Sequence, residues 1–169
     1  MGLSYNNIID ADGHILEPAD TWERYIDPAF RDRALRISKR DGKDVLEIDG
    51  KPSAFFDVKV LTMLGAMGKS TEELASMMEE PYPGSAPFGS MDPSERVEHL
   101  DAEGIAKAIL YPSLGLTWEC EVTDPKLSMA YARAYNRWIC DFCADSGGRL
   151  IAAAHISLAD PSGAAKELE

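Results

Sequence analysis

The chain has 169 residues, of which 45% are hydrophobic and 27% charged, a composition typical of a soluble globular domain large enough for a hydrophobic core. Its net charge of −12 argues against a surface for nucleic acid or an anionic membrane, where lysine and arginine must neutralise phosphates. No apolar run approaches the roughly 20 residues of a membrane span, and no secretory signal opens the chain. Together with an odd count of 3 cysteines, these features predict a cytoplasmic protein.

The first predicted elements are a strand and a hairpin. Residues 7–12 form a short apolar run that ends in polar residues, which predicts a buried strand. Residues 35–50 alternate polar and apolar side chains around Asp41-Gly42, the dipeptide typical of a two-residue hairpin turn. We interpret residues 34–90 as an insertion after the first strand.

From residue 91 onward, predicted helices alternate with buried strands. The expected elements are a helix over 92–103, a strand over 105–113, a helix over 125–146, a strand over 149–157 and a helix over 161–169. Each helix begins at an Asp-Pro pair, in which the aspartate caps free N–H groups and the proline takes the first helical position. The alternation predicts right-handed βαβ units and a parallel sheet.

This order fits either a (β/α) barrel or an open doubly wound sheet. Three strands are too few to close a barrel, which takes eight strands and roughly 250 residues. The chain also ends within the last predicted helix, before any C-cap. Both features predict that the sequence is the N-terminal portion of a longer protein.

Polar residues gather at the end of the first strand, in the stretch IIDADGHILEP over residues 8–18. Functional groups of parallel α/β folds collect at the carboxyl ends of strands. Because residues two apart in an extended chain point to the same side, Asp12 and His14 are candidates to bind one metal ion. A carboxylate and a neutral imidazole suit zinc, manganese or iron. Such a metal would need two or more further ligands and an open position for water.

The stretch IDADGHILEP resembles the first-strand motif of the amidohydrolase superfamily, in its branch related to aminocarboxymuconate-semialdehyde decarboxylase. That motif is H-x-H or a variant with an acid in the first slot, so Asp12 matches the first ligand position and His14 the second. Three later stretches resemble the same branch in the same order: PADTWERYIDPAFRDRA, MDPSERVEHLDAEGIAKAILYPSLGL and RLIAAAHISLADPSGAAKEL. The resemblance covers nearly the whole chain and is weakest over residues 51–90.

The resemblance implies an α/β fold, namely the N-terminal part of a (β/α)8 TIM barrel with about three parallel strands present and the insertion after strand 1. Residues 1–169 would form one partial barrel domain. It also implies a divalent metal, often zinc, and hydrolysis or non-oxidative decarboxylation of small carboxylic acids. A histidine and an aspartate from later strands would complete the site beyond residue 169. The expected partner is a small-molecule carboxylic acid, with no nucleic acid and no membrane, and a homo-oligomer stays open.

Three further residues are candidates for substrate binding. Tyr111 ends the second predicted barrel strand, Trp118 lies on the loop after it, and His155 lies in the third. A packing role is the alternative for each of them. Glu17 either shapes the exit from the first strand or holds His14 as a hydrogen-bond partner.

Other interpretations of the opening stretch stay open. It also resembles motif one of the haloacid dehalogenase superfamily, where Asp10 would be the nucleophile and Asp12 the general acid/base of a phosphatase. A polar turn without function is another alternative. The chain could also be a catalytically incomplete fragment or an interaction protein of the same fold, because three parallel strands leave an open sheet edge. In the metal-site interpretation, Asp10 has only a supporting role.

Overall fold

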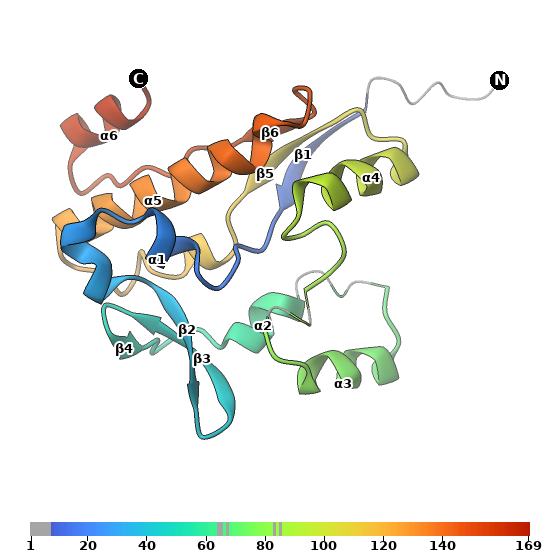
Figure 1. The fold of residues 1–169 in the computed structure, drawn as a ribbon, viewed down its shortest axis with the longest axis horizontal. Helices are drawn as coiled ribbons and strands as arrows, with labels where there is room; N and C mark the ends of the chain where they lie inside the picture. Colours follow the sequence, from blue (N-terminus) through green and yellow to red (C-terminus); the bar gives the residue numbers. More distant parts are fainter. Residues whose placement is uncertain (1–7, 64–65, 67, 83, 85) are drawn as a thin grey trace.

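The computed structural model describes residues 8–63, 66, 68–82, 84 and 86–169. They form a mixed α/β fold with one parallel and one antiparallel sheet, each of three strands (Figure 1). Within these ranges, no helix combines the length and the apolar character needed to cross a membrane.

The parallel sheet carries the polar stretch. It consists of β1 (Ile9–His14), β5 (Lys107–Tyr111) and β6 (Leu150–Ala152), in the order β1-β5-β6. All three strands lie within or beside the apolar runs that predicted them. The third is shorter than expected, because it ends at Ala152 and the chain to residue 157 continues as coil. The strand order follows the chain without reversal.

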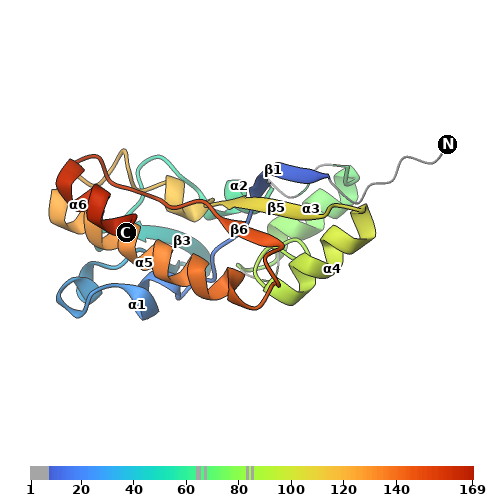
Figure 2. The same ribbon diagram turned by 90° about the horizontal axis from the view of Figure 1, so that it is seen from above.

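Two helices connect these strands and lie on the same face of the sheet (Figure 2). They are α4 (Pro93–Glu103) and α5 (Pro125–Ala144). As predicted, an aspartate side chain caps each helix of this half: Asp92 on α4, Asp124 on α5 and Asp160 on α6 (Pro161–Glu167). A doubly wound sheet carries helices on both faces, so this arrangement is compatible with part of a TIM-barrel-like fold.

The segment between β1 and α4 contains the antiparallel sheet. β2 (Arg36–Arg40) and β3 (Lys43–Ile48) are joined by Asp41 and Gly42, whose φ angles of 50° and 77° are those of a two-residue hairpin turn. The hairpin prediction is therefore confirmed. The other elements of this segment are β4 (Lys51–Pro52), α2 (Val58–Thr62) and α3 (Thr71–Glu79).

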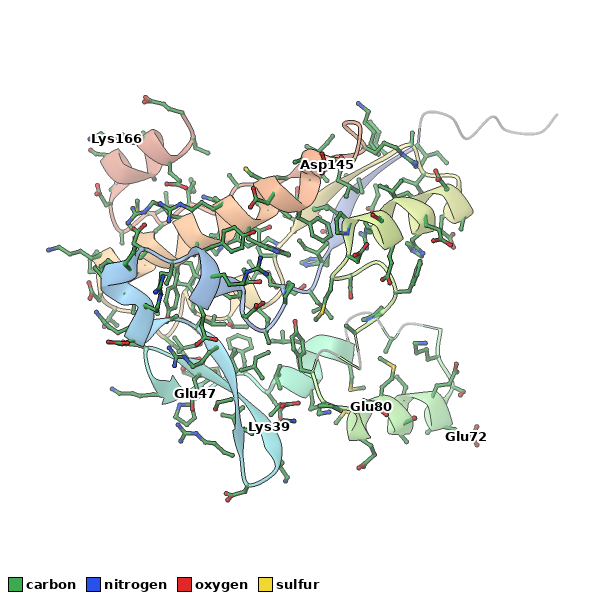
Figure 3. All side chains as sticks on the ribbon, viewed as in Figure 1. Lys39, Glu47, Glu72, Glu80, Asp145 and Lys166 are labelled. Carbon is green, nitrogen blue, oxygen red and sulfur yellow. The ribbon has the colours of Figure 1, made fainter. Side chains whose placement is uncertain are left out.

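The hydrophobic core lies between the parallel sheet, α5 and α1 (Thr21–Tyr25), where side chains fill the space between these elements (Figure 3). Trp22 of α1 is fully buried and donates its indole N–H to the carbonyl oxygen of Tyr131 on α5, at 3.2 Å. On the sheet face opposite α4 and α5, Ile9 and Ile151 are exposed. Parallel sheets are normally covered on both faces, and the described residues leave this face uncovered.

Candidate functional site

A bulge in β1 sorts the polar residues of the opening stretch onto two faces. The pairing with β5 runs from Asp10 opposite Ala108 to Gly13 opposite Leu110, so β1 carries one extra residue there. Ala108 and Leu110 are buried toward the helices. Because successive strand residues alternate in direction, Asp10 faces the helices and His14 faces the open side. The bulge thus turns Asp10 toward the helices, although Asp10, Asp12 and His14 all line one cavity at the strand end.

Asp10 supports the strand end from the helix side. Its Oδ1 accepts a hydrogen bond from the backbone N–H of Asp12 at 3.0 Å, and its Oδ2 lies 3.9 Å from Nη2 of Arg96 on α4. The Arg96 side chain is only 11% exposed, and this burial lowers its pKa. A Cβ atom at Gly13 would lie 2.9 Å from Arg96 Nη2 and 3.0 Å from the backbone oxygen of Ile109, so a side chain at this position would crowd both.

Asp12 and His14 form a pair on the accessible side of the strand end. His14 Nδ1 lies 2.9 Å from the carbonyl oxygen of Pro112. A carbonyl oxygen only accepts, so Nδ1 carries the proton and donates, and the lone pair of the neutral ring is on Nε2. That Nε2 lies 3.9 Å from Asp12 Oδ1. Two donors on a tetrahedral zinc ion lie about 3.4 Å apart, so the exposed Asp12 carboxylate would have to move closer by about 0.5 Å to share an ion with His14.

The pair supplies only part of a coordination sphere. Across the ranges that the structure describes, no group of three or more His, Cys, Asp or Glu side chains is placed to hold a metal ion. A zinc site needs three or four protein ligands, so Asp12 and His14 fit a metal only together with further donors.

A cavity of about 470 Å³ opens beside the pair, within the size range of small-ligand sites. Its lining comes from β1, the loop before α4, and α4 itself, and it includes Asp12, His14, Phe88, Ser90, Arg96 and His99. The sequence interpretation missed Arg96. Its spacing of four residues from the buried Leu100 was the available signal, because such residues share one helix face.

Glu17 is fully buried at the exit from β1 and binds the turn that follows β5. Its carboxylate accepts backbone N–H groups from Ser113 at 3.2 Å, Leu114 at 2.9 Å and Gly115 at 3.0 Å. Burial raises the pKa of Glu17 to about 7, against the opposing effect of these N–H groups. Glu17 therefore shapes the strand exit, and its link to His14 is indirect, through Ser113, whose Oγ lies 3.4 Å from His14 Nδ1.

Of the three residues predicted to bind substrate, Tyr111 lies beside Asp12 and His14. It is partly buried, and its ring centre is 6.2 Å from that of His14, which it faces across the β1–β5 pairing. The side chain is not among those that line the 470 Å³ cavity. Tyr111 thus borders the pair from β5 without reaching the cavity.

The other two lie together in a packed layer. Trp118 and His155 stack with 4.9 Å between ring centres and are only 1% and 8% exposed. His155 Nε2 lies 2.6 Å from a carboxylate oxygen of Glu119, and its ring meets that of Tyr135 on α5 edge-on at 6.1 Å. Neither Trp118 nor His155 lines the cavity beside Asp12.

Comparison with known proteins agrees with one of the two family resemblances. No protein-family model and no curated protein matches the sequence. Among solved structures, the fold is similar to that of an amidohydrolase from Mycobacterium avium subsp. paratuberculosis K-10, with a TM-score of 0.71 and 25% identity. The match covers 96% of this chain and 46% of that one, so this chain spans about half of its length. The match supports a fold like that of part of an amidohydrolase.

Proposed function

We propose that this chain is part of a metal-dependent hydrolase or non-oxidative decarboxylase that acts on a small carboxylic acid. The similarity to a solved amidohydrolase supports the hydrolase class. The resemblance of four stretches to the decarboxylase branch adds the decarboxylation alternative. The observation that carries the proposal is the accessible Nε2 lone pair of His14, 3.9 Å from Asp12 Oδ1.

In this proposal, Asp12 and His14 hold the metal through Oδ1 and Nε2, with zinc as the first choice and manganese or iron as alternatives. When bound, such an ion lowers the pKa of water toward neutrality and polarises a substrate oxygen. The Pro112 carbonyl keeps the proton on His14 Nδ1 and thereby keeps Nε2 available. The Asp12 side chain is 88% exposed and approachable from the cavity that it lines.

The substrate would occupy the cavity next to the pair. The Arg96 guanidinium lines this cavity and provides the positive charge that a carboxylate seeks. Tyr111, Trp118 and His155 remain proposed substrate contacts, although none of them lines this cavity; Tyr111 is favoured, because a substrate that extends past His14 would meet its ring first.

A second candidate is a catalytically incomplete fragment or an interaction protein of the same fold. Two observations favour it: the described residues supply no third metal donor, and the sheet face that carries Ile9 and Ile151 is open. The less favoured phosphatase alternative gives Asp10 a nucleophilic role, but Asp10 faces Arg96 on the helix side of the strand.

Turnover distinguishes these candidates. The full-length protein, stripped with a chelator and reloaded with Zn²⁺, is incubated with a panel of small aliphatic and aromatic carboxylic acids, and carbon dioxide release and hydrolysis are followed. We expect turnover that Asp12→Ala and His14→Ala abolish, whereas Asp32→Ala, an exposed aspartate outside the cavity, leaves it unchanged. A folded, zinc-loaded chain without turnover on any acid favours the second candidate.

A further inference from the structure

We infer that Glu17 is a positioning residue for His14: by anchoring the turn after β5, it fixes the imidazole tautomer that leaves Nε2 directed at Asp12. This inference rests on the proposed function in one respect: that function explains why a free Nε2 is useful, namely for binding a metal ion. The tautomer itself is a property of the chain without metal.

The first step is the contact between the carboxylate and the turn. Glu17 accepts the backbone N–H groups of three successive residues, from Ser113 to Gly115. In the part of the chain that the structure describes, no cationic side chain bonds to Glu17, so backbone dipoles alone balance its charge. Burying a carboxylate costs several kcal/mol and an apolar side chain would avoid that cost, which indicates that the carboxylate has a specific task.

The second step leads from the turn to His14. Pro112 immediately precedes the three residues that Glu17 holds, and its carbonyl oxygen accepts the Nδ1–H of His14 at 2.9 Å. Ser113 offers its Oγ at 3.4 Å from the same nitrogen. The group that selects the tautomer therefore sits on the segment that Glu17 anchors.

The packing between Glu17 and the turn at residues 112–115 leaves the turn no room to shift. A Cβ atom at Gly115 would lie 2.7 Å from Pro112 Cβ and 3.1 Å from Glu17 Oε1. On the other side, the Tyr82 hydroxyl donates to the backbone carbonyl of Glu17 at 2.5 Å. Glu17 is thus held at its backbone and at its carboxylate, and the turn is packed directly against it.

The test measures the tautomer of His14 rather than activity. In the full chain with ¹⁵N-labelled histidine, at a pH where the imidazole is neutral, long-range ¹⁵N–¹H spectra report which ring nitrogen carries the proton. We expect protonated Nδ1 in the wild type and a mixture of both tautomers in Glu17→Gln. The same variant should bind Zn²⁺ about 10- to 100-fold more weakly, in line with losses of outer hydrogen-bond partners at metal sites. Glu103→Gln, an exposed carboxylate at the end of α4, should match the wild type in both measurements.

A second variant keeps the test decisive if Glu17→Gln does not fold. Gly115→Ala displaces the turn while Glu17 is retained, and it should give the same tautomer mixture. A folded variant of either kind with the wild-type tautomer overturns the inference. A wild type that binds no Zn²⁺ contradicts the proposed function instead, and a tautomer change in the variants then still supports the positioning role of Glu17.

Discussion

The Nδ1–H group of His14 donates a hydrogen bond to the carbonyl oxygen of Pro112 at 2.9 Å, between residues 98 positions apart in the sequence. This bond joins the ends of β1 and β5 and decides which imidazole nitrogen is free. The opposite nitrogen lies near Asp12, so one backbone contact links the strand pairing to the candidate metal site.

Gly13→Ala should destabilise the fold and disturb the pair. Its Cβ would lie 2.9 Å from Arg96 Nη2 and 3.0 Å from the carbonyl oxygen of Ile109, and a backbone atom of a neighbouring strand cannot move away easily. We expect a loss of about 1–3 kcal/mol in the free energy of unfolding, measured by urea denaturation. A variant as stable as the wild type would contradict the close packing of Arg96 and Ile109 around Gly13.

Glu17 should make the stability of the protein depend on pH in a defined window. Its pKa in the folded protein is about 7, raised from 4.5 by burial. The folded state therefore binds more protons than the unfolded state between these values, so this contribution is full below pH 4.5 and is lost as the pH rises through about 7. Relative to Glu17→Gln, the free energy of unfolding of the wild type should fall by on the order of 3 kcal/mol between pH 4.5 and 8.

The measurement for this prediction is urea denaturation of both proteins across that range. The difference between the two proteins at each pH isolates the contribution of this carboxyl group. A pH-independent difference would mean that Glu17 has an ordinary pKa in the folded state.

Tyr82→Phe should loosen the segment between β1 and α4 from the strand exit. The variant leaves the buried carbonyl of Glu17 without the hydroxyl that donates to it at 2.5 Å. We expect a loss of about 1–2 kcal/mol in the free energy of unfolding. Tyr25→Phe is the matched control, because that hydroxyl donates to Asp141 at the surface, and its removal should cost less than about 0.5 kcal/mol. Equal effects would contradict the role of Tyr82.

Trp118 and Tyr111 should respond differently to truncation. Trp118 is almost fully buried against His155 and Tyr131, so Trp118→Ala should cost about 3–5 kcal/mol of stability. Tyr111 is partly buried at the strand end, so Tyr111→Ala should cost less and instead weaken substrate or Zn²⁺ binding. Thermal unfolding measures the loss of stability in each variant, and a parallel Zn²⁺ titration measures the loss of binding. A larger loss of stability in Tyr111→Ala than in Trp118→Ala would contradict this assignment.

Local sequence signals predicted the elements well. The Asp-Pro pairs and the Asp41-Gly42 turn each act over a few residues and appear in the structure as expected, whereas the apolar runs located the strands but not their ends. Their physical basis is the capping of free N–H groups and the backbone angles of a tight turn, which neighbouring residues determine.

The arrangement of the candidate site depended on contacts that sequence spacing does not contain. The bulge in β1 brings Asp10 near Arg96 while Asp12 stays exposed, although both residues line the same cavity. Glu17 meets Ser113 across 96 positions, and Arg96 reaches Gly13 from a different element. Strand register and the packing of a helix on a sheet decide these contacts, so they follow from the tertiary fold alone.

The central claim is that Asp12 and His14 bind one metal ion together. Its most direct test is elemental analysis of the full-length wild-type protein and of its Asp12→Ala and His14→Ala variants after incubation with Zn²⁺ and dialysis, with Asp32→Ala as control. We expect the wild type and the Asp32→Ala control to retain zinc, and Asp12→Ala and His14→Ala to lose it. Full zinc occupancy in folded Asp12→Ala and His14→Ala would contradict it.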